Sequence, residues 1–236
     1  MNIVITGASR GIGFELAKIF CLNTNNTIVI TARSIEKLNE LKQACIRLNP
    51  NSKIIPIACD LSNSDAVSNF ILELNKHLST IDILINNAGA IVNKPFLELS
   101  QADIEHVYKV NVFSVIALIQ NLLPYMEQKT KSHIVNISSI GGFQGSAKFA
   151  GLSAYSSSKA ALTCLTECLA EEFKDMNTAF NCLALGATQT EMLEEAFPGY
   201  KAPITAAQMA EYIADFSKNA QKYMNGKIIP VSLSTP

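Results

Sequence analysis

Short apolar runs alternate with longer amphipathic stretches along the whole chain. Seven runs are apolar on both sides of the strand alternation, as expected for strands covered on both faces: 2–6, 27–31, 53–58, 82–86, 133–138, 179–184 and 227–231. Stretches with helical periodicity separate them, among them 11–21, 35–48, 64–77, 101–124 and 155–174. The alternation predicts an α/β fold, with a doubly wound, mostly parallel sheet of about seven strands and helices on both faces.

No linker rich in Pro, Gly or Ser divides the 236 residues, and 48% of them are hydrophobic, enough for a substantial core. We therefore expect a single domain over residues 1–236. In a doubly wound sheet, ligands bind beyond the carboxyl ends of the strands, so the candidate chemistry is expected at that edge.

Charge and cysteine content limit the kinds of partner that the chain is expected to bind. Nineteen basic and twenty acidic side chains leave a formal net charge of -1, which does not indicate a nucleic-acid partner. The six cysteines form no C-x-x-C motif and predict free thiols in a reducing cytoplasm. Cys164 and Cys168 lie one helical turn apart in an apolar run, where we expect core packing rather than a metal site.

The segment "MNIVITG" passes directly into a strand pattern, and no run reaches the roughly eighteen apolar residues needed to cross a bilayer. We expect a soluble, cytoplasmic protein with no membrane partner.

The first strand ends in "TGASRGIG", residues 6–13. Gly7, Gly11 and Gly13 allow a tight turn and let a pyrophosphate approach main-chain N–H groups at a helix N-terminus. A plain glycine-rich turn is the alternative. Its position in the first strand–helix unit favours a dinucleotide site.

The end of the second strand, "TAR", refines the expected cofactor. A fold that prefers NAD(H) tends to place an acid there for the ribose 2′-hydroxyl, but Ala32 holds that position and Arg33 follows. Arg33, and Arg10 from the glycine turn, can bind a 2′-phosphate, although either can be a plain surface charge and Glu36 lies nearby. The charges favour NADP(H) over NAD(H).

In "AYSSSK", residues 154–159, Tyr155 and Lys159 are four residues apart. They share one face if a helix begins at Ser153 or Ala154. An isolated pair of this kind is most often a helix's solvated edge, so its neighbours must decide.

Six motifs occur in order: "TGASRGIG", "CDLS" (59–62), "NNAG" (86–89), "VNV" (110–112), "NISS" (136–139) and "YSSSK" (155–159). With these motifs the chain resembles the short-chain dehydrogenase/reductase family, from residue 2 to at least residue 192. The resemblance implies a Rossmann fold and hydride transfer between NADP(H) and a carbonyl or secondary alcohol.

The resemblance also implies roles for four residues. Tyr155 is the expected general acid or base, and Lys159 lowers its pKa and binds the nicotinamide ribose. Ser139 orients the substrate oxygen, with the adjacent Ser138 as the competing candidate. Asn111 supports a proton relay, the alternative being a buried side chain that bonds the local backbone.

By glycine geometry, charge and resemblance together, the expected cofactor-binding residues are Gly7, Ser9, Arg10, Gly11, Ile12, Gly13, Arg33, Asp60, Leu61, Asn87, Ala88, Gly89, Tyr155, Lys159 and Thr190. No metal site is expected.

Two departures from the family pattern concern the substrate side. Leu185 stands where the family usually has proline before Gly186, which predicts a looser loop toward Thr190, and the segment between Ser139 and Tyr155 is long. A candidate apolar pocket, or else lid or interface packing, comprises Phe143, Phe149, Leu152, Met192, Leu193 and Phe197.

The long apolar faces of 101–124 and 155–174 predict a homodimer or homotetramer. Two functions remain open: an NADP(H)-dependent oxidoreductase acting on a small carbonyl or alcohol, or a non-catalytic NADP(H)-binding regulatory or assembly subunit. The full set of candidate catalytic residues favours the enzyme.

Overall fold

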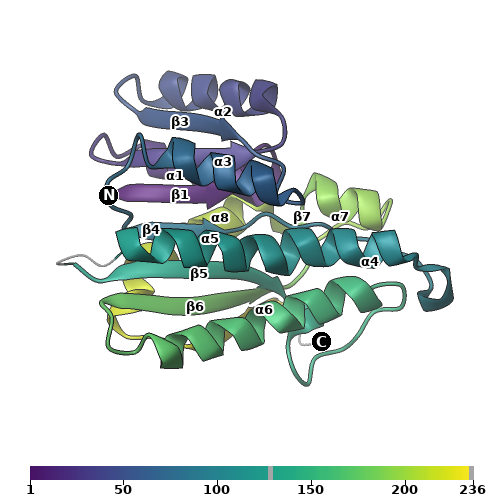
Figure 1. Cartoon of the computed structure of the whole chain (residues 1–236). Coiled ribbons are helices and arrows are strands. Elements are labelled where there is room, and N and C mark those ends of the chain that lie inside the picture. The colour runs from purple at the N-terminus through teal and green to yellow at the C-terminus, as the bar shows by residue number, and fades with distance from the viewer. Residues whose placement is uncertain (127–129, 234–236) are drawn as a thin grey trace.

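A seven-stranded parallel sheet forms the centre of the protein (Figure 1). The structure is a computed structural model and describes residues 1–126 and 130–233. The sheet has the order β3-β2-β1-β4-β5-β6-β9. Its strands are β1 Asn2–Thr6, β2 Thr27–Ala32, β3 Lys53–Ala58, β4 Ile83–Asn86, β5 Ser132–Ser139, β6 Thr178–Leu185 and β9 Lys227–Val231. This confirms the predicted fold class, and the strand order reverses between β1 and β4, where a ligand crevice is expected.

Helices cover both faces of the sheet and bury a separate apolar cluster on each (Figure 1). One face packs against α1 Gly11–Cys21, α2 Ile35–Leu48 and α8 Ala206–Asn219. The other packs against α3 Ser64–Leu74, α5 Ser114–Leu122 and α6 Ser153–Glu172. The apolar side chains alternate between the two clusters along a strand: Ile3 and Ile5 of β1 belong to one and Val4 to the other.

Smaller elements complete the described chain. They are η1 Phe96–Glu98, α4 Gln101–Tyr108, η3 Leu123–Tyr125, η4 Ile140–Gly142, β7 Thr188–Gln189, α7 Glu191–Ala196, β8 Ile204–Thr205 and η5 Ala220–Lys222. Several helices begin at polar caps, and both α4 and α8 begin with a capping box: Ser100 with Asp103, and Thr205 with Gln208.

The single helix predicted over 101–124 is interrupted. A π-helical segment, η2 Lys109–Phe113, separates α4 from α5 and contains Asn111. A π-helical turn adds one residue to the helix locally, and the apolar pattern of 101–124 did not predict it. Such turns occur frequently at functional sites.

The stretch Gln101–Tyr125 is long and apolar enough to cross a membrane, with a mean hydropathy of 1.3 over its most apolar window. However, 56% of that window is buried inside the protein, and the buried residues of α5 pack with the core cluster beneath the sheet. The stretch therefore has the character of a core helix.

The prediction that Cys164 and Cys168 pack in the core is wrong, because both side chains are exposed. The buried face of α6 carries Leu162, Thr166 and Ala170 instead. Thr166 is tolerated there because its hydroxyl accepts a hydrogen bond from Asn136 and donates to the carbonyl of Leu162. All six cysteines are free.

Candidate functional site

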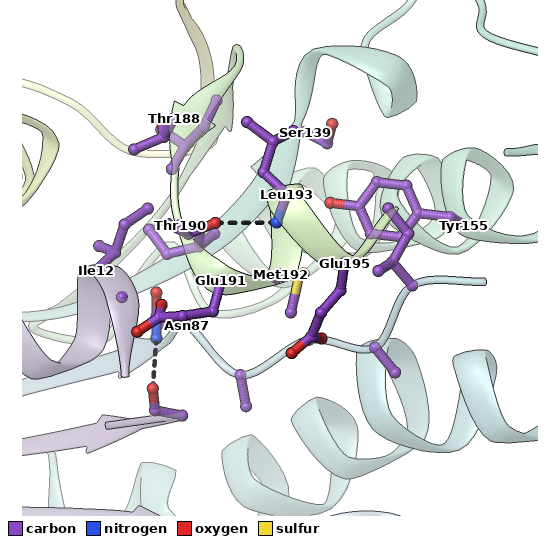
Figure 2. Close-up of a pocket in the computed structure, with 18 of the residues that line it drawn as sticks. Ile12, Asn87, Ser139, Tyr155, Thr188, Thr190, Glu191, Met192, Leu193 and Glu195 are labelled. Carbon is purple, nitrogen blue, oxygen red and sulfur yellow. Dashed lines mark hydrogen bonds between the residues drawn. The ribbon is translucent and has the colours of Figure 1, made fainter. Parts of the chain in front are cut away.

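A cavity of about 1010 Å³ opens at the carboxyl ends of the strands. Segments far apart in the sequence meet around it: the glycine turn after β1, the loop after β4, the end of β5, the first turn of α6, and α7 (Figure 2). The position matches the expected crevice at the reversal of the strand order.

The glycine turn is tight in a way that only glycine allows. Gly7 and Gly11 have φ angles of 69° and 57°, in the left-handed region. A Cβ atom on Gly7 would lie 2.7 Å from the Cα of Ala88, and one on Gly13 would overlap the carbonyl oxygen of Gly7. The turn therefore packs directly against the loop after β4.

Hydrogen bonds hold the same turn to that loop. Asn87 donates from its side-chain amide to the carbonyls of Thr6 (2.9 Å) and Gly7 (3.2 Å), and Figure 2 draws one of these two bonds. In return, the Thr6 hydroxyl accepts from the backbone N–H groups of Asn87 and Ala88, both at 3.0 Å. These bonds orient the turn so that the N-terminus of α1 faces the cavity.

No side chain caps the first turn of α1, because Arg10, the N-cap residue, makes no capping hydrogen bond. The glycine turn and these uncapped amides fit the pyrophosphate of a dinucleotide. Among the described residues, no group of three or more His, Cys, Asp or Glu side chains is arranged to hold a metal ion.

The adenosine end expected from the sequence lies beside β2 and β3. Asp60 lines the cavity, and its carboxylate accepts hydrogen bonds from the backbone N–H (2.9 Å) and hydroxyl (2.8 Å) of Ser62. These bonds, helped by the charge of Arg33, lower the pKa of Asp60. Arg33 follows β2, is exposed, and lines the same cavity with Lys37.

Tyr155 lies in the first turn of α6 and faces Ser139 at the end of β5 (Figure 2). Burial raises the pKa of Tyr155, and a side-chain hydrogen bond with Ser139 partly offsets that rise. The neighbouring Ser138 is already engaged, because its hydroxyl donates to the carbonyl of Lys159 at 2.8 Å. Of the two serines, Ser139 is the one whose hydroxyl lowers the pKa of Tyr155.

Lys159 is 4% exposed, and its Nζ lies 5.9 Å from the centre of the Tyr155 ring. The ammonium donates to the carbonyl of Ile137 at 2.8 Å. Burial lowers the pKa of Lys159 to about 8. The lysine is therefore a buried cation beside the tyrosine, poised to titrate just above neutral pH.

Asn111 is fully buried in the π-helical segment. Its side chain accepts from the N–H of Ala90 (2.8 Å) and donates to the carbonyl of Ala90 (2.9 Å) and to Ser158 (2.9 Å). The amide thus joins η2 to the loop after β4 and to α6. Its oxygen and the Lys159 Nζ each lie 3.5 Å from the point that a Cβ on Gly89 would occupy.

The helix α7 closes the cavity over the glycine turn. Thr190 caps α7 by accepting from the N–H of Leu193 at 3.2 Å, and its methyl group lies near Gly11 (Figure 2). Arg10 makes a two-point ion pair with Glu195, whose second contact, from Nη2 to Oε2, is 2.9 Å. Glu195 is not recognisable as a site residue from the sequence, because nothing in its local pattern shows that it meets a residue 185 positions away.

Most of the residues predicted for the site line this one cavity. Gly13 and Asn111 do not line it: Gly13 packs beneath the turn, and Asn111 acts behind the loop after β4. Of the six predicted pocket residues, Phe143 lies outside the lining, while the other five belong to it. The structure adds three residues to the predicted site: Thr6, which bonds the loop after β4, and Lys37 and Glu195, which line the cavity.

Leu185, which stands where the family usually has proline, lies at the end of a paired strand. Leu185 is the last residue of β6 and pairs with Val231, and the following Gly186 donates its N–H to the carbonyl of Val231 at 2.9 Å. A Cβ on Gly186 would lie 2.8 Å from the Cβ of Ser232, so glycine is needed there for close approach. Strand pairing therefore fixes the start of the loop that leads from Gly186 to Thr190.

Comparison with known proteins identifies the family. The family model described as "short chain dehydrogenase" matches residues 1–201. The chain is 30% identical over 239 residues to the 3-oxoacyl-[acyl-carrier-protein] reductase FabG of Aquifex aeolicus, covering 97% of this chain and 94% of that protein. It is 32% identical over 192 residues to a fatty acyl-CoA reductase of Acinetobacter baylyi, covering 80% of this chain but only 63% of that protein.

Solved structures agree with the fold. A short chain dehydrogenase from Burkholderia cenocepacia, determined in complex with NADP, superposes with a TM-score of 0.86 at 26% identity, over 98% of this chain and 95% of that one. The chain therefore belongs to the short-chain dehydrogenase/reductase family of oxidoreductases, whose members act on small molecules with a nicotinamide cofactor.

Proposed function

We propose that residues 1–236 form one catalytic domain that transfers a hydride between NADP(H) and a carbonyl or secondary alcohol. The observation that carries the proposal is the convergence of Ser139, Tyr155 and Lys159 on one cavity that also contains the glycine turn. A protein that only bound a nucleotide would have no need for a tyrosine hydroxyl paired with a serine beside a buried ammonium.

When bound, the reduced nicotinamide supplies the hydride, and the chain supplies the proton. Tyr155 donates its hydroxyl proton to the carbonyl oxygen in reduction and removes it in oxidation. Because burial raises its pKa, the phenol is protonated at neutral pH, which suits a general acid. Ser139 holds the same oxygen by a hydrogen bond as its negative charge develops.

Lys159 and Asn111 support this step. A cation whose Nζ lies 5.9 Å from the Tyr155 ring favours the phenolate that forms after proton transfer. We propose that the same ammonium also binds the nicotinamide ribose. Asn111 lies next to Lys159 across Gly89, a position from which it can support a proton relay to the lysine.

The charges at the adenosine end support NADP(H) rather than NAD(H). Arg10, Arg33 and Lys37 line that end of the cavity, and Ala32 leaves no carboxylate at the end of β2. Cationic side chains there attract a 2′-phosphate, and a carboxylate would repel it. The structural relative from Burkholderia cenocepacia was determined with NADP.

The part of the cavity that we assign to the substrate is lined by apolar side chains, which favours a carbonyl compound with a hydrophobic chain or ring. Its lining includes Phe149, Leu152, Met192, Leu193 and Phe197. Because two relatives are named as reductases of 3-oxoacyl and fatty acyl thioesters, such thioesters belong in the test panel. We also propose a cytoplasmic homodimer or homotetramer, supported by the six free cysteines and by exposed apolar side chains on or near α4, among them Phe96, Ile104 and Phe113.

The test is loss of NADPH absorbance against ketones, aldehydes, diketones, quinones and acyl thioesters. The parent is expected to turn over at least one class, and Tyr155→Phe to lose turnover by at least about a hundredfold while still binding NADPH, because only the proton donor is removed. Tyr212→Phe, on α8 outside the cavity, is the matched control. Equal turnover by Tyr155→Phe contradicts the mechanism, and nucleotide binding without any turnover favours the non-catalytic alternative.

A further inference from the structure

Two carboxylates of α7, those of Glu191 and Glu195, lie over the part of the cavity where the glycine turn would receive phosphate groups. Figure 2 shows Glu191 and Glu195 extending from α7 into the cavity that Asn87 and Tyr155 also line. The Glu191 carboxylate lies 3.6 Å from the point that a Cβ on Gly11 would occupy. Negative charge in this position opposes the binding of another anion.

Glu195 acts on one particular cation. It occupies both terminal nitrogens of the Arg10 guanidinium in a two-point ion pair. The pairing raises the pKa of Arg10 and lowers the pKa of Glu195, so each group is charged across the neutral range. Lys37 and Arg33 also act on Glu195, lowering its pKa further.

The same three cations are the ones that the proposed function assigns to the 2′-phosphate. A phosphate oxygen approaching Arg10 must compete with a carboxylate already seated on its two-point donor face. While α7 is closed in this position, Glu195 therefore stands in for the anion that Arg10 would bind.

We propose that Glu195 is a specificity-determining residue: it competes with the 2′-phosphate for Arg10 and so restrains the preference for phosphorylated over unphosphorylated nucleotides. The inference rests on the proposed cofactor site. Arg10 and Glu195 are partly and largely exposed, with side-chain exposures of 34% and 60%, so the effect is modest. Exposed ion pairs of this kind correspond to a change in affinity of about twofold to fivefold.

The experiment measures the dissociation constants of adenosine 2′,5′-bisphosphate and 5′-AMP by calorimetry. The two probes differ only in the 2′-phosphate, so the ratio of their constants reports selectivity and is insensitive to a general loosening of the fold. Glu195→Gln is expected to bind the bisphosphate about twofold to fivefold more tightly, with 5′-AMP nearly unchanged, and the gain is expected to shrink at high salt.

Two matched variants isolate the contact. Glu194→Gln removes the same charge from the same helix, but its carboxylate accepts from the N–H of Gly199 at 3.0 Å, so the ratio should stay at the parent value. In an Arg10→Gln background, Glu195→Gln should produce a clearly smaller gain than in the parent, because the cation for which Glu195 competes directly is gone and only its weaker effect on Arg33 and Lys37 remains.

An unchanged ratio in Glu195→Gln, or an equal gain with Glu194→Gln, overturns the inference. The parent's own ratio tests the cofactor preference separately. If the parent binds the bisphosphate no better than 5′-AMP, the NADP(H) proposal is contradicted, and the comparison of Glu195→Gln with the parent still decides the role of Glu195.

Discussion

Replacing Lys159 with methionine should stabilise the fold at neutral pH while it abolishes turnover. Lys159 is 4% exposed, and burial lowers its pKa from 10.5 to about 8. At neutral pH the folded protein therefore holds a charged ammonium in a place that disfavours charge. Methionine has a similar length and carries no charge, although it loses the bond of 2.8 Å to the carbonyl of Ile137.

The magnitude follows from linkage between protonation and folding. Between about pH 8 and 10.5 the unfolded chain binds the proton on Lys159 and the folded chain does not, so stability rises with pH in that window. Below about pH 8 both states are protonated and the term is constant. From about pH 7 to pH 9.5 the parent should gain about 2 kcal/mol from this residue, and Lys159→Met should gain nothing from it.

Urea unfolding at the two pH values measures the effect. Buried thiols such as Cys59, whose pKa burial raises to about 11, act in the opposite direction over the same range. They are present in both proteins, so the difference between parent and variant removes most of their contribution. That difference should change by about 2 kcal/mol, or about 1 M in urea midpoint. Lys76→Met, at a surface position with 68% side-chain exposure, should show no such change.

A difference between parent and Lys159→Met that is constant from about pH 7 to pH 9.5 would refute the reasoning, because it would mean that the buried ammonium does not titrate in this range. A larger difference with the opposite sign would mean that the folded site stabilises the charge. The loss of turnover in the same variant is a separate readout, which checks the catalytic role.

Two further predictions concern the core and the glycine turn. His133 is fully buried: its Nδ1–H donates to the carbonyl of Ser217, its Nε2 accepts from the Asn181 amide, and burial lowers its pKa to about 4. Stability should therefore fall by about 3 kcal/mol more in the parent than in His133→Gln as the pH drops from about 6.5 to 4, since only the unfolded histidine is protonated there; equal urea-midpoint changes would contradict this. Gly13→Ala should weaken NADPH binding by at least about tenfold in a fluorescence titration, because the new Cβ overlaps the carbonyl of Gly7; parent-like affinity would show that the turn is not the cofactor site.

The apolar pattern was sufficient for the sheet, and most of the site residues expected from the sequence do line the cavity. Each of the seven predicted strands occurs within one residue of its expected bounds, because strands buried on both faces must be continuous apolar runs. The glycine turn and the Tyr155–Lys159 pair were also visible, since each depends on local geometry: a left-handed backbone in one case and one helical turn in the other.

The local sequence pattern could not show which face of α6 is buried. It also could not show that η2 separates α4 from α5. Cys164 and Cys168 were expected inside and lie outside, because the buried face of α6 carries Leu162, Thr166 and Ala170, and Asn136 on β5 satisfies the Thr166 hydroxyl there. The π-helical turn at Asn111 is likewise recognisable only through its bonds to Ala90.

Sequence by itself determined the fold class and the residue types available for chemistry, because both follow from periodicity and from motifs read within a few positions. Only the tertiary structure shows that the Ser138 hydroxyl is bonded to the carbonyl of Lys159 while Ser139 acts on the pKa of Tyr155, and that Arg10 meets Glu195. These contacts join residues up to 185 positions apart, and only the closed packing of α7 over the glycine turn brings the last pair together. The charge on Arg10 is a property of the sequence, whereas the anion that occupies it is a property of the fold.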